Sequence, residues 1–389
     1  MTTEHFITRP MSLWLDLVRA IAALVVVVGH AHQLEIYTGY YPFSLGLQKN
    51  AVVVFFVLSG LVIATATDKR EDSLSSYVIA RISRIVPVAV VATLVALAVA
   101  ALDANLGAAP MFEEDLGWAD PVEALQALLF LSSSYDASFA LNPVHWSLCY
   151  EVWFYALFAA ATFARGGSRW LWLGVLGLAA GPNALLLLPS WLVGVWIARS
   201  PRARNVPAAR ASMYLALALV SLFIMPKVAP PVSNFVWGLV PWSPYYSLYA
   251  PTDFALALAT ALGFMGLRAL SAGGFVLPAA CEKPVRYLAG CSFSLYLLHW
   301  PLLKLARMAG IGANDSLVGF VAIVAGVVAV SAAFATVTEH RRYATRAMLE
   351  RWVRPSHASP RASASAPALR PSSGESPRWR RSRPWSARP

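Results

Sequence analysis

Long apolar segments recur along the chain, and short polar stretches separate them. A helix needs roughly 20 apolar residues to cross a hydrocarbon core of about 30 Å. The segments do not alternate apolar and polar positions as the strands of a membrane barrel do, and backbone groups in lipid must be satisfied within the segment. The sequence therefore predicts an all-α polytopic membrane protein with about ten transmembrane helices. The predicted spans are Ser12–Gln33, Asn50–Thr67, Ala80–Leu102, His145–Ala164, Gly167–Gly181, Asn183–Ala198, Ala211–Lys227, Thr252–Leu270, Val285–Met308 and Leu317–Val337.

The fifth and sixth spans form one apolar stretch that is interrupted at Gly181-Pro182-Asn183. Gly, Pro and Asn in succession are a turn signal. We therefore expect a tight hairpin of two short spans. The apolar stretch that ends at His30 is expected to stay as the first span, because no small-residue cleavage site follows it.

Charge patterning bears on the orientation of these spans. Only 13% of the residues are charged and 58% are apolar, whereas a soluble globular domain has about a quarter charged residues. The net charge of +11 comes from basic residues that gather in alternate loops and near the C-terminus, the pattern of cytoplasmic loops. This predicts a multi-pass protein of the cell inner (plasma) membrane with both termini in the cytoplasm, and it gives no reason to expect nucleic acid as a partner.

Two predicted outside loops differ in chemistry. Residues 103–142 are acidic, and residues 229–250 are rich in Trp, Tyr and Pro. Aromatic side chains are common at membrane interfaces, and they also suit stacking on the apolar faces of sugar rings. Residues 1–345 are expected to form one transmembrane domain. Residues 346–389 form a basic tail rich in Pro, Ser and Arg that is expected to be mostly disordered.

Ionisable residues inside the first span are candidates for function, because a charge in a span is costly. Asp16, Arg19 and His30 lie there. Arg19 and His30 are about 16 Å apart along a helix and about three turns apart, so they share a face. Arg19 would lie toward the cytoplasm and His30 toward the outside. The alternative is an Asp16–Arg19 ion pair, with His30 at the membrane interface.

Further polar residues occupy later spans. Arg81 and Arg84 lie three positions apart on one helical face, where they could anchor the cytoplasmic end or grip phosphate groups bidentately. Glu151 lies about two turns into its span and must be protonated or paired, which an ion pair between two helices would also explain. His299, before Pro301, suggests a kinked, hydrated cavity, and packing against a polar neighbour is the alternative.

Five short segments together resemble the integral-membrane acyltransferase family 3, over nearly the whole chain except the tail. They occur in the correct order and on the correct spans, which makes the combination specific although each is weak alone. The segments are Leu15-Asp16-Leu17-Val18-Arg19-Ala20-Ile21-Ala22-Ala23 with His30, Phe55-Phe56-Val57-Leu58-Ser59-Gly60, Arg81-Ile82-Ser83-Arg84-Ile85-Val86-Pro87, Trp146-Ser147-Leu148 with Glu151, Phe154 and Tyr155, and Ser294-Leu295-Tyr296-Leu297-Leu298-His299-Trp300-Pro301.

The resemblance implies transfer of an acyl group, often acetyl, from a cytoplasmic coenzyme A thioester to a hydroxyl of a glycan or another acceptor. It implies that His30 is the essential histidine and that the three arginines handle the donor: Arg19, Arg81 and Arg84. Two features depart from the family. Many members have a proline after the glutamate that corresponds to Glu339, where this chain has His340. Some relatives also carry a fused extracytoplasmic hydrolase-like domain, and no such domain is expected in this chain.

The hypothesis is a membrane O-acyltransferase in which His30 is the general base for an acceptor hydroxyl, since unperturbed His titrates near pH 6.5. Glu151 would orient an imidazole or neutralise Arg19, and Asp16, Ser59, Tyr296 and His299 would support the site. The co-substrate would be acetyl-CoA or another acyl-CoA, with a cell-surface glycan or exopolysaccharide as acceptor. No metal and no permanently bound cofactor is expected.

A transporter or flippase of a glycan or lipid-linked substrate is the main alternative, because intramembrane Arg, Glu and His also suit substrate paths. Such proteins usually show paired repeats with broken helices, and only one Gly-Pro break is visible here. A non-catalytic scaffold or sensor is a third, weaker option.

Overall fold

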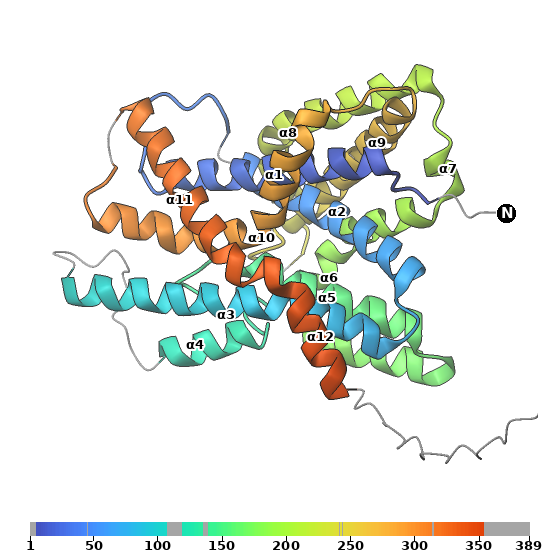
Figure 1. The fold of residues 1–389 in the computed structure, drawn as a ribbon, viewed down its shortest axis with the longest axis horizontal. Coiled ribbons are helices and arrows are strands. Elements are labelled where there is room, and N and C mark those ends of the chain that lie inside the picture. Colours follow the sequence, from blue (N-terminus) through green and yellow to red (C-terminus); the bar gives the residue numbers. More distant parts are fainter. Residues whose placement is uncertain are drawn as a thin grey trace, which may run out of the picture. The chain divides into compact units, whose positions relative to one another are not determined.

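The computed structural model describes residues 5–44, 46–106, 119–134, 139–240, 242, 244–312 and 315–353, and these form an all-α fold (Figure 1). The helices are α1 (Arg9–Gln33), α2 (Leu47–Arg70), α3 (Leu74–Leu106), α4 (Ala119–Leu128), α5 (His145–Phe163), α6 (Gly166–Arg199), α7 (Pro201–Arg204), α8 (Ala208–Trp237), α9 (Ala250–Ala272), α10 (Ala279–Met308), α11 (Leu317–Val337), the 3-10 turn η1 (Glu339–Arg341) and α12 (Arg342–Val353). The all-α prediction is confirmed.

Seven segments of the described residues are long and apolar enough to cross a membrane: α1, α2, α3, α6, α8, α9 and the segment Leu317–Val353 that begins with α11. The shorter α5 and the more polar α10 contain two further predicted spans, and they carry Glu151 and His299. Each of the ten predicted spans lies within a helix, apart from Ala164, which follows the end of α5, but several helices extend well beyond the predicted bounds. The tail from residue 354 onward lies outside the described residues, and α12 runs across the predicted boundary at residue 345.

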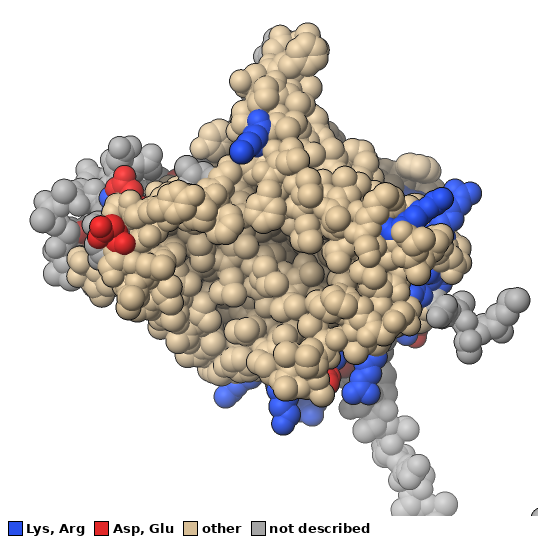
Figure 2. Space-filling view, turned by 90° about the horizontal axis from the view of Figure 1, so that it is seen from above, with Lys and Arg blue, Asp and Glu red and all other residues tan. Residues whose placement is uncertain are grey.

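The surface of the described residues suits a lipid environment. Phe235, Val318 and Leu171 are among many large apolar side chains that are exposed. In Figure 2 most of the drawn face carries neither basic nor acidic side chains, and Lys and Arg gather mainly along its right and lower edges. A wide apolar belt of this kind is atypical of a water-facing surface.

The predicted break inside α6 is present. Gly181 has φ +77°, ψ 168°, which is not helical, and glycine adopts positive φ without a steric penalty. A Cβ on Gly177 would lie 4.0 Å from a methyl of Leu185, although residues eight apart in a straight helix are separated by about 12 Å. The two halves of α6 therefore fold back against each other, as the hairpin prediction requires.

Glycines let α2 and the second half of α6 approach closely. A Cβ on Gly60 would collide with the backbone oxygen of Trp191, and a Cβ on Gly194 would collide with the backbone oxygen of Val57. Small residues at such crossings are a common device of membrane helix packing. The crossing fixes α2, which lines the candidate site.

Two internal prolines are accommodated by asparagines from other parts of the chain. A proline removes the N–H that would bond the carbonyl four residues earlier. Pro301 thus frees the Leu297 carbonyl of α10, and the Asn142 side-chain amide donates to it at 2.9 Å. Pro226 frees the Leu222 carbonyl of α8, and the Asn50 amide donates to it at 2.8 Å. Neighbouring polar groups of this kind are what makes proline tolerable in a membrane helix.

The end of α8 differs from the sequence analysis. The second outside loop was predicted to begin near Ala229, but α8 continues to Trp237 through Pro230 and Pro231. In the acidic loop, the short helix α4 was also not predicted. It packs on α3, where Ala124 and Ala127 join a small apolar cluster with Ala96 and Ala100.

Candidate functional site

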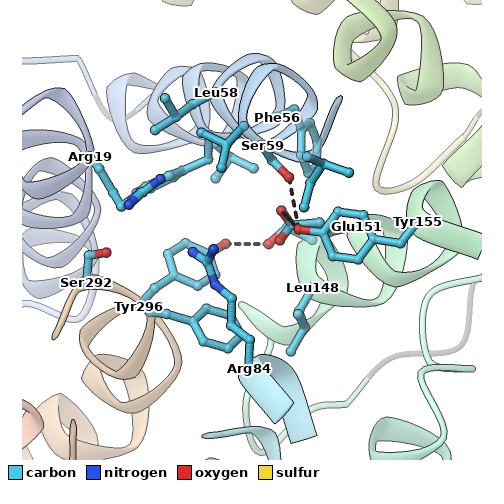
Figure 3. A pocket seen from close by; sticks show the side chains of 16 residues that line it. Arg19, Phe56, Leu58, Ser59, Arg84, Leu148, Glu151, Tyr155, Ser292 and Tyr296 are labelled. Carbon is cyan, nitrogen blue, oxygen red and sulfur yellow. Dashed lines mark hydrogen bonds between the residues drawn. The ribbon is translucent and has the colours of Figure 1, made fainter. Parts of the chain in front are cut away.

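An inner pocket with about 670 Å³ of empty space, including its opening, lies between five helices (Figure 3). Its polar lining comes from α1, α2, α3, α5 and α10: Arg19, Ser59, Arg84, Ser147, Glu151, Tyr155, Ser292 and Tyr296. The remaining walls are apolar and include Phe55 and Phe56. Enclosed, mostly apolar clefts with a few convergent polar groups are typical ligand sites.

The polar groups of this inner pocket form two sets. Arg19 and Arg84 supply positive charge from α1 and α3, and Arg19 lies within electrostatic range of both Arg84 and Glu151. On the opposite wall, the Tyr155 hydroxyl donates to Glu151 at 2.5 Å and lies 3.0 Å from the Ser59 hydroxyl. Trp191 Nε1 donates to Ser59 at 3.2 Å. The carboxylate is therefore held in place by neighbours other than the arginines.

Arg81 lies elsewhere, although it is only three residues from Arg84. Its Nη2 bonds both carboxylate oxygens of Glu71, at 2.7 and 2.8 Å, and its guanidinium lies 4.6 Å from the Tyr77 ring centroid. It lines a separate, nearly apolar groove between α3 and α5. The structure thus places Arg84 in the inner pocket and Arg81 outside it, in a buried ion pair.

An outer pocket with about 1250 Å³ of empty space, including its opening, contains His30. Its lining is rich in aromatic and amide side chains and includes Gln33, Gln48, Lys49, Trp146, Tyr245, Tyr246, Tyr249 and Trp300. Lys49 is paired with Asp253 at 2.7 Å. The predicted aromatic loop after α8 therefore contributes directly to the site that contains His30.

His30 is held by α10. Its Nδ1 lies 2.8 Å from Nε2 of His299, and the edge of Trp300 contacts its ring at a centroid distance of 5.2 Å. His299 is fully buried, and its Nδ1 lies 3.2 Å from the Leu295 carbonyl oxygen. The hydrogen bond between His30 and His299 thus joins two residues that are 269 positions apart.

A thin partition separates the two pockets, because Val52 and Tyr296 line both. The Tyr296 hydroxyl lies 2.6 Å from that of Ser147 and donates to the Val144 carbonyl at 3.4 Å. The Phe55 ring packs edge-on against the Tyr296 ring at 5.8 Å. Arg19 and His30 therefore line neighbouring cavities that share two side chains as a common wall.

The remaining candidates from the sequence lie around these pockets. Asp16 bonds Arg19 at 3.4 Å and Arg286 at 3.0 Å, so the predicted Asp16–Arg19 pair is present together with the pocket position of Arg19. Glu151 lines the inner pocket and His30 the outer one. Glu151 thus shares a pocket with Arg19 and Arg84 and not with His30.

Three polar residues around the site were not among the site residues expected from the sequence. Glu71 holds Arg81, Asn142 completes the kink of α10, and the buried Glu339 accepts the backbone N–H of Ser294 at 2.8 Å. Glu339 lies within electrostatic range of Arg84. A carboxylate at the end of the most apolar helix was a visible signal for Glu339, whereas nothing local marked the other two.

Within the described residues, no group of three or more His, Cys, Asp or Glu side chains is arranged to hold a metal ion. The chain matches the acyltransferase domain family over residues 12–336. The comparisons with curated proteins and with solved structures found no match. The match covers α1 to α11 and includes every residue placed in the two pockets. The chain therefore belongs to the acyltransferase 3 family and is a multi-pass membrane acyltransferase.

Proposed function

We propose that this acyltransferase moves an acetyl group from cytoplasmic acetyl-CoA, bound in the inner pocket, to a hydroxyl of a cell-surface glycan bound in the outer pocket. The observation that supports this most strongly is the arrangement of two cavities that share Val52 and Tyr296, with arginines on one side and His30 on the other. In this proposal the chain makes ten crossings of the plasma membrane, and both termini are cytoplasmic.

The inner pocket suits the donor. Arg19 and Arg84 offer guanidinium groups, which bind phosphate oxygens in charge-assisted pairs. The apolar walls suit the pantetheine arm, which is on the order of 15–20 Å long when extended. That length is comparable to the separation of about 16 Å between Arg19 and His30 along α1. A donor held by the arginines would therefore bring its thioester to the Tyr296 partition.

The outer pocket suits a carbohydrate. Trp146 stacks with Tyr246 at a centroid distance of 5.9 Å, and Trp300 and Tyr249 add further rings to the lining. Aromatic faces pack on the apolar faces of sugars, and the Gln33 and Gln48 amides can bond hydroxyls. Sugar hydroxyls are poor nucleophiles until a base accepts their proton.

Direct transfer then follows. His30 Nε2 accepts the proton of the acceptor hydroxyl as the oxygen attacks the thioester carbonyl carbon. The C–O bond forms and the C–S bond breaks, and the thiolate takes the proton from His30 to leave as free coenzyme A. The acyl group passes the partition when the Tyr296 hydroxyl leaves Ser147, a gating step of the kind that often accompanies catalysis.

His30→Ala tests the proposal. Loss of a general base lowers the rate by about 10²- to 10⁴-fold, while acyl-CoA binding in the separate inner pocket should persist. Purified protein in nanodiscs is assayed for thiol release and acceptor acetylation, with and without glycan, and mass spectrometry of surface glycans identifies the natural acceptor. Undiminished acetylation by the variant would remove His30 from the chemistry. Translocation of a glycan without consumption of acetyl-CoA would replace the proposal by a transporter.

A further inference from the structure

The His30–His299 pair has a direction that its second hydrogen bond fixes. A backbone carbonyl oxygen can only accept hydrogen bonds, and it has two lone pairs, one of which remains when the helix N–H bond is made. His299 Nδ1, 3.2 Å from the Leu295 oxygen, must therefore carry a proton. In a neutral imidazole the other nitrogen is then an acceptor, so His299 Nε2 accepts and His30 Nδ1 donates.

The surroundings favour the neutral form of His299. Within the described residues, the groups around its ring include His30, the backbone carbonyls of Leu295 and Tyr296, and the Tyr296 ring, and none of these carries a negative charge. An unpaired charge in such a buried place is strongly unfavourable. The chain of protons thus runs from His30 to His299 to the carbonyl, which is the order that orients the imidazole in a hydrolase triad.

Given the acyl transfer proposed above, on which this inference rests, we propose that His299 is a positioning residue: through its bond to the Leu295 carbonyl it holds His30 as the Nδ1–H tautomer, so that the Nε2 lone pair faces the acceptor. His30 is half-buried and lines the outer pocket, and its Nδ1 is already engaged. The one nitrogen left for a sugar hydroxyl is therefore the basic one. The opposite tautomer would present an N–H there, which cannot accept a proton.

The same pair also serves the second half of the reaction. When Nε2 takes the acceptor proton, His30 becomes a cation whose Nδ1–H still donates to a neutral imidazole. The charge is thereby spread along an existing hydrogen bond, and no group has to reorient. His299 touches neither pocket's ligand in this arrangement, since it contributes to the lining of neither cavity.

Two substitutions at His299 separate positioning from packing. His299→Gln places an amide oxygen where Nε2 accepts, so the His30 tautomer is kept and kcat should stay within about tenfold of the wild type. His299→Phe fills the same space with no acceptor, and kcat should fall by about 10²- to 10⁴-fold, the range associated with a misplaced general base. KM for acetyl-CoA should be unchanged in both, because the donor binds across the partition.

Nitrogen-15 NMR of histidine-labelled protein in nanodiscs supplies a readout that a structural role would not move. The chain has seven histidines, and the difference from a His30→Ala sample isolates the His30 signals. We expect a protonated Nδ1 and an unprotonated Nε2 in the wild type and in His299→Gln. In His299→Phe the Nε2–H form should become populated.

The outcomes distinguish this inference from the function on which it rests. If His30→Ala is inactive while His299→Phe keeps wild-type kcat, or if wild-type His30 carries its proton on Nε2, the positioning role is wrong and the transfer stands. If His30→Ala transfers acetyl normally, the proposed role of His30 fails first. Equal losses in His299→Gln and His299→Phe, with an unchanged His30 tautomer, would reduce His299 to a packing residue.

Discussion

Arg81 and Arg84 are three residues apart and chemically identical, yet the structure predicts opposite consequences for their removal. Arg84 lines the inner pocket and forms no ion pair of its own within the described residues. Replacing it with Ala removes a phosphate contact, and a hydrogen bond to a charged group contributes about 1.5–3 kcal/mol. Since 1.4 kcal/mol is a factor of about ten, Arg84→Ala should weaken acetyl-CoA binding by roughly 10- to 150-fold.

Arg81→Ala should act on stability instead. The carboxylate of Glu71 is 4% exposed and Arg81 is 12% exposed, so removal of the cation leaves a buried, unpaired charge. Breaking such a pair costs roughly 3–5 kcal/mol. The thermal unfolding midpoint in detergent should drop clearly, and donor affinity should change by no more than about twofold, well under 1 kcal/mol. The Glu71→Gln, Arg81→Ala double variant removes the stranded charge and should recover much of the midpoint.

Titration calorimetry with acetyl-CoA and thermal unfolding of the same nanodisc samples measure both quantities. The two variants are matched controls for each other, because each deletes one arginine from the same stretch of α3. Equal losses of donor affinity in both variants would refute the claim that Arg84 contacts the donor and Arg81 does not. An Arg81→Ala protein with the wild-type unfolding midpoint would show that the Arg81–Glu71 ion pair contributes little to stability.

Three further predictions concern the partition and the helices that frame it. Tyr296→Ala should join the two pockets and admit water to the thioester, so thiol release without acceptor should rise severalfold, and an unchanged rate would mean that Tyr296 is not the barrier. Asn142→Leu leaves the Leu297 carbonyl without its hydrogen bond, which costs about 1–3 kcal/mol. Adding Pro301→Ala should restore the thermal midpoint, because residue 301 then has an N–H that can donate to this carbonyl. A double variant no more stable than Asn142→Leu would show that the Asn142 amide does not compensate for Pro301. Gly60→Ala places a methyl against the Trp191 backbone and should reduce the yield of folded protein. Gly174 faces open space, so Gly174→Ala should be neutral or slightly stabilising. Equal effects of the two variants would contradict the close crossing of α2 and α6.

Hydropathy predicted the helices well because membrane burial leaves a local signal about 20 residues long. The break at Gly181 was equally local, since it depends on three successive turn-forming residues. The continuation of α8 to Trp237 was not predicted, because two successive prolines, Pro230 and Pro231, look like a helix stop in the sequence.

The candidate site was predictable in its residue types but not in its partners. His30, Arg19 and Glu151 stood out as ionisable groups in apolar runs, and the structure brings Arg19 and Glu151 into one pocket. Spacing alone treats Arg81 and Arg84 as equivalent, whereas the rotation of α3 turns one toward the cavity and the other toward Glu71. The bond of His30 to His299 depends on how α1 packs on α10, which no local pattern encodes.

The central claim is that donor and acceptor lie on opposite sides of one partition, and sealed proteoliposomes test it directly. Acetyl-CoA labelled on the acetyl group is added outside vesicles that enclose the glycan acceptor, so that only molecules with the arginine pocket facing outward can react. The account predicts labelled glycan inside intact vesicles, and no label with His30→Ala. Acetylation that occurs only when donor and acceptor are present on the same side of the membrane would contradict it.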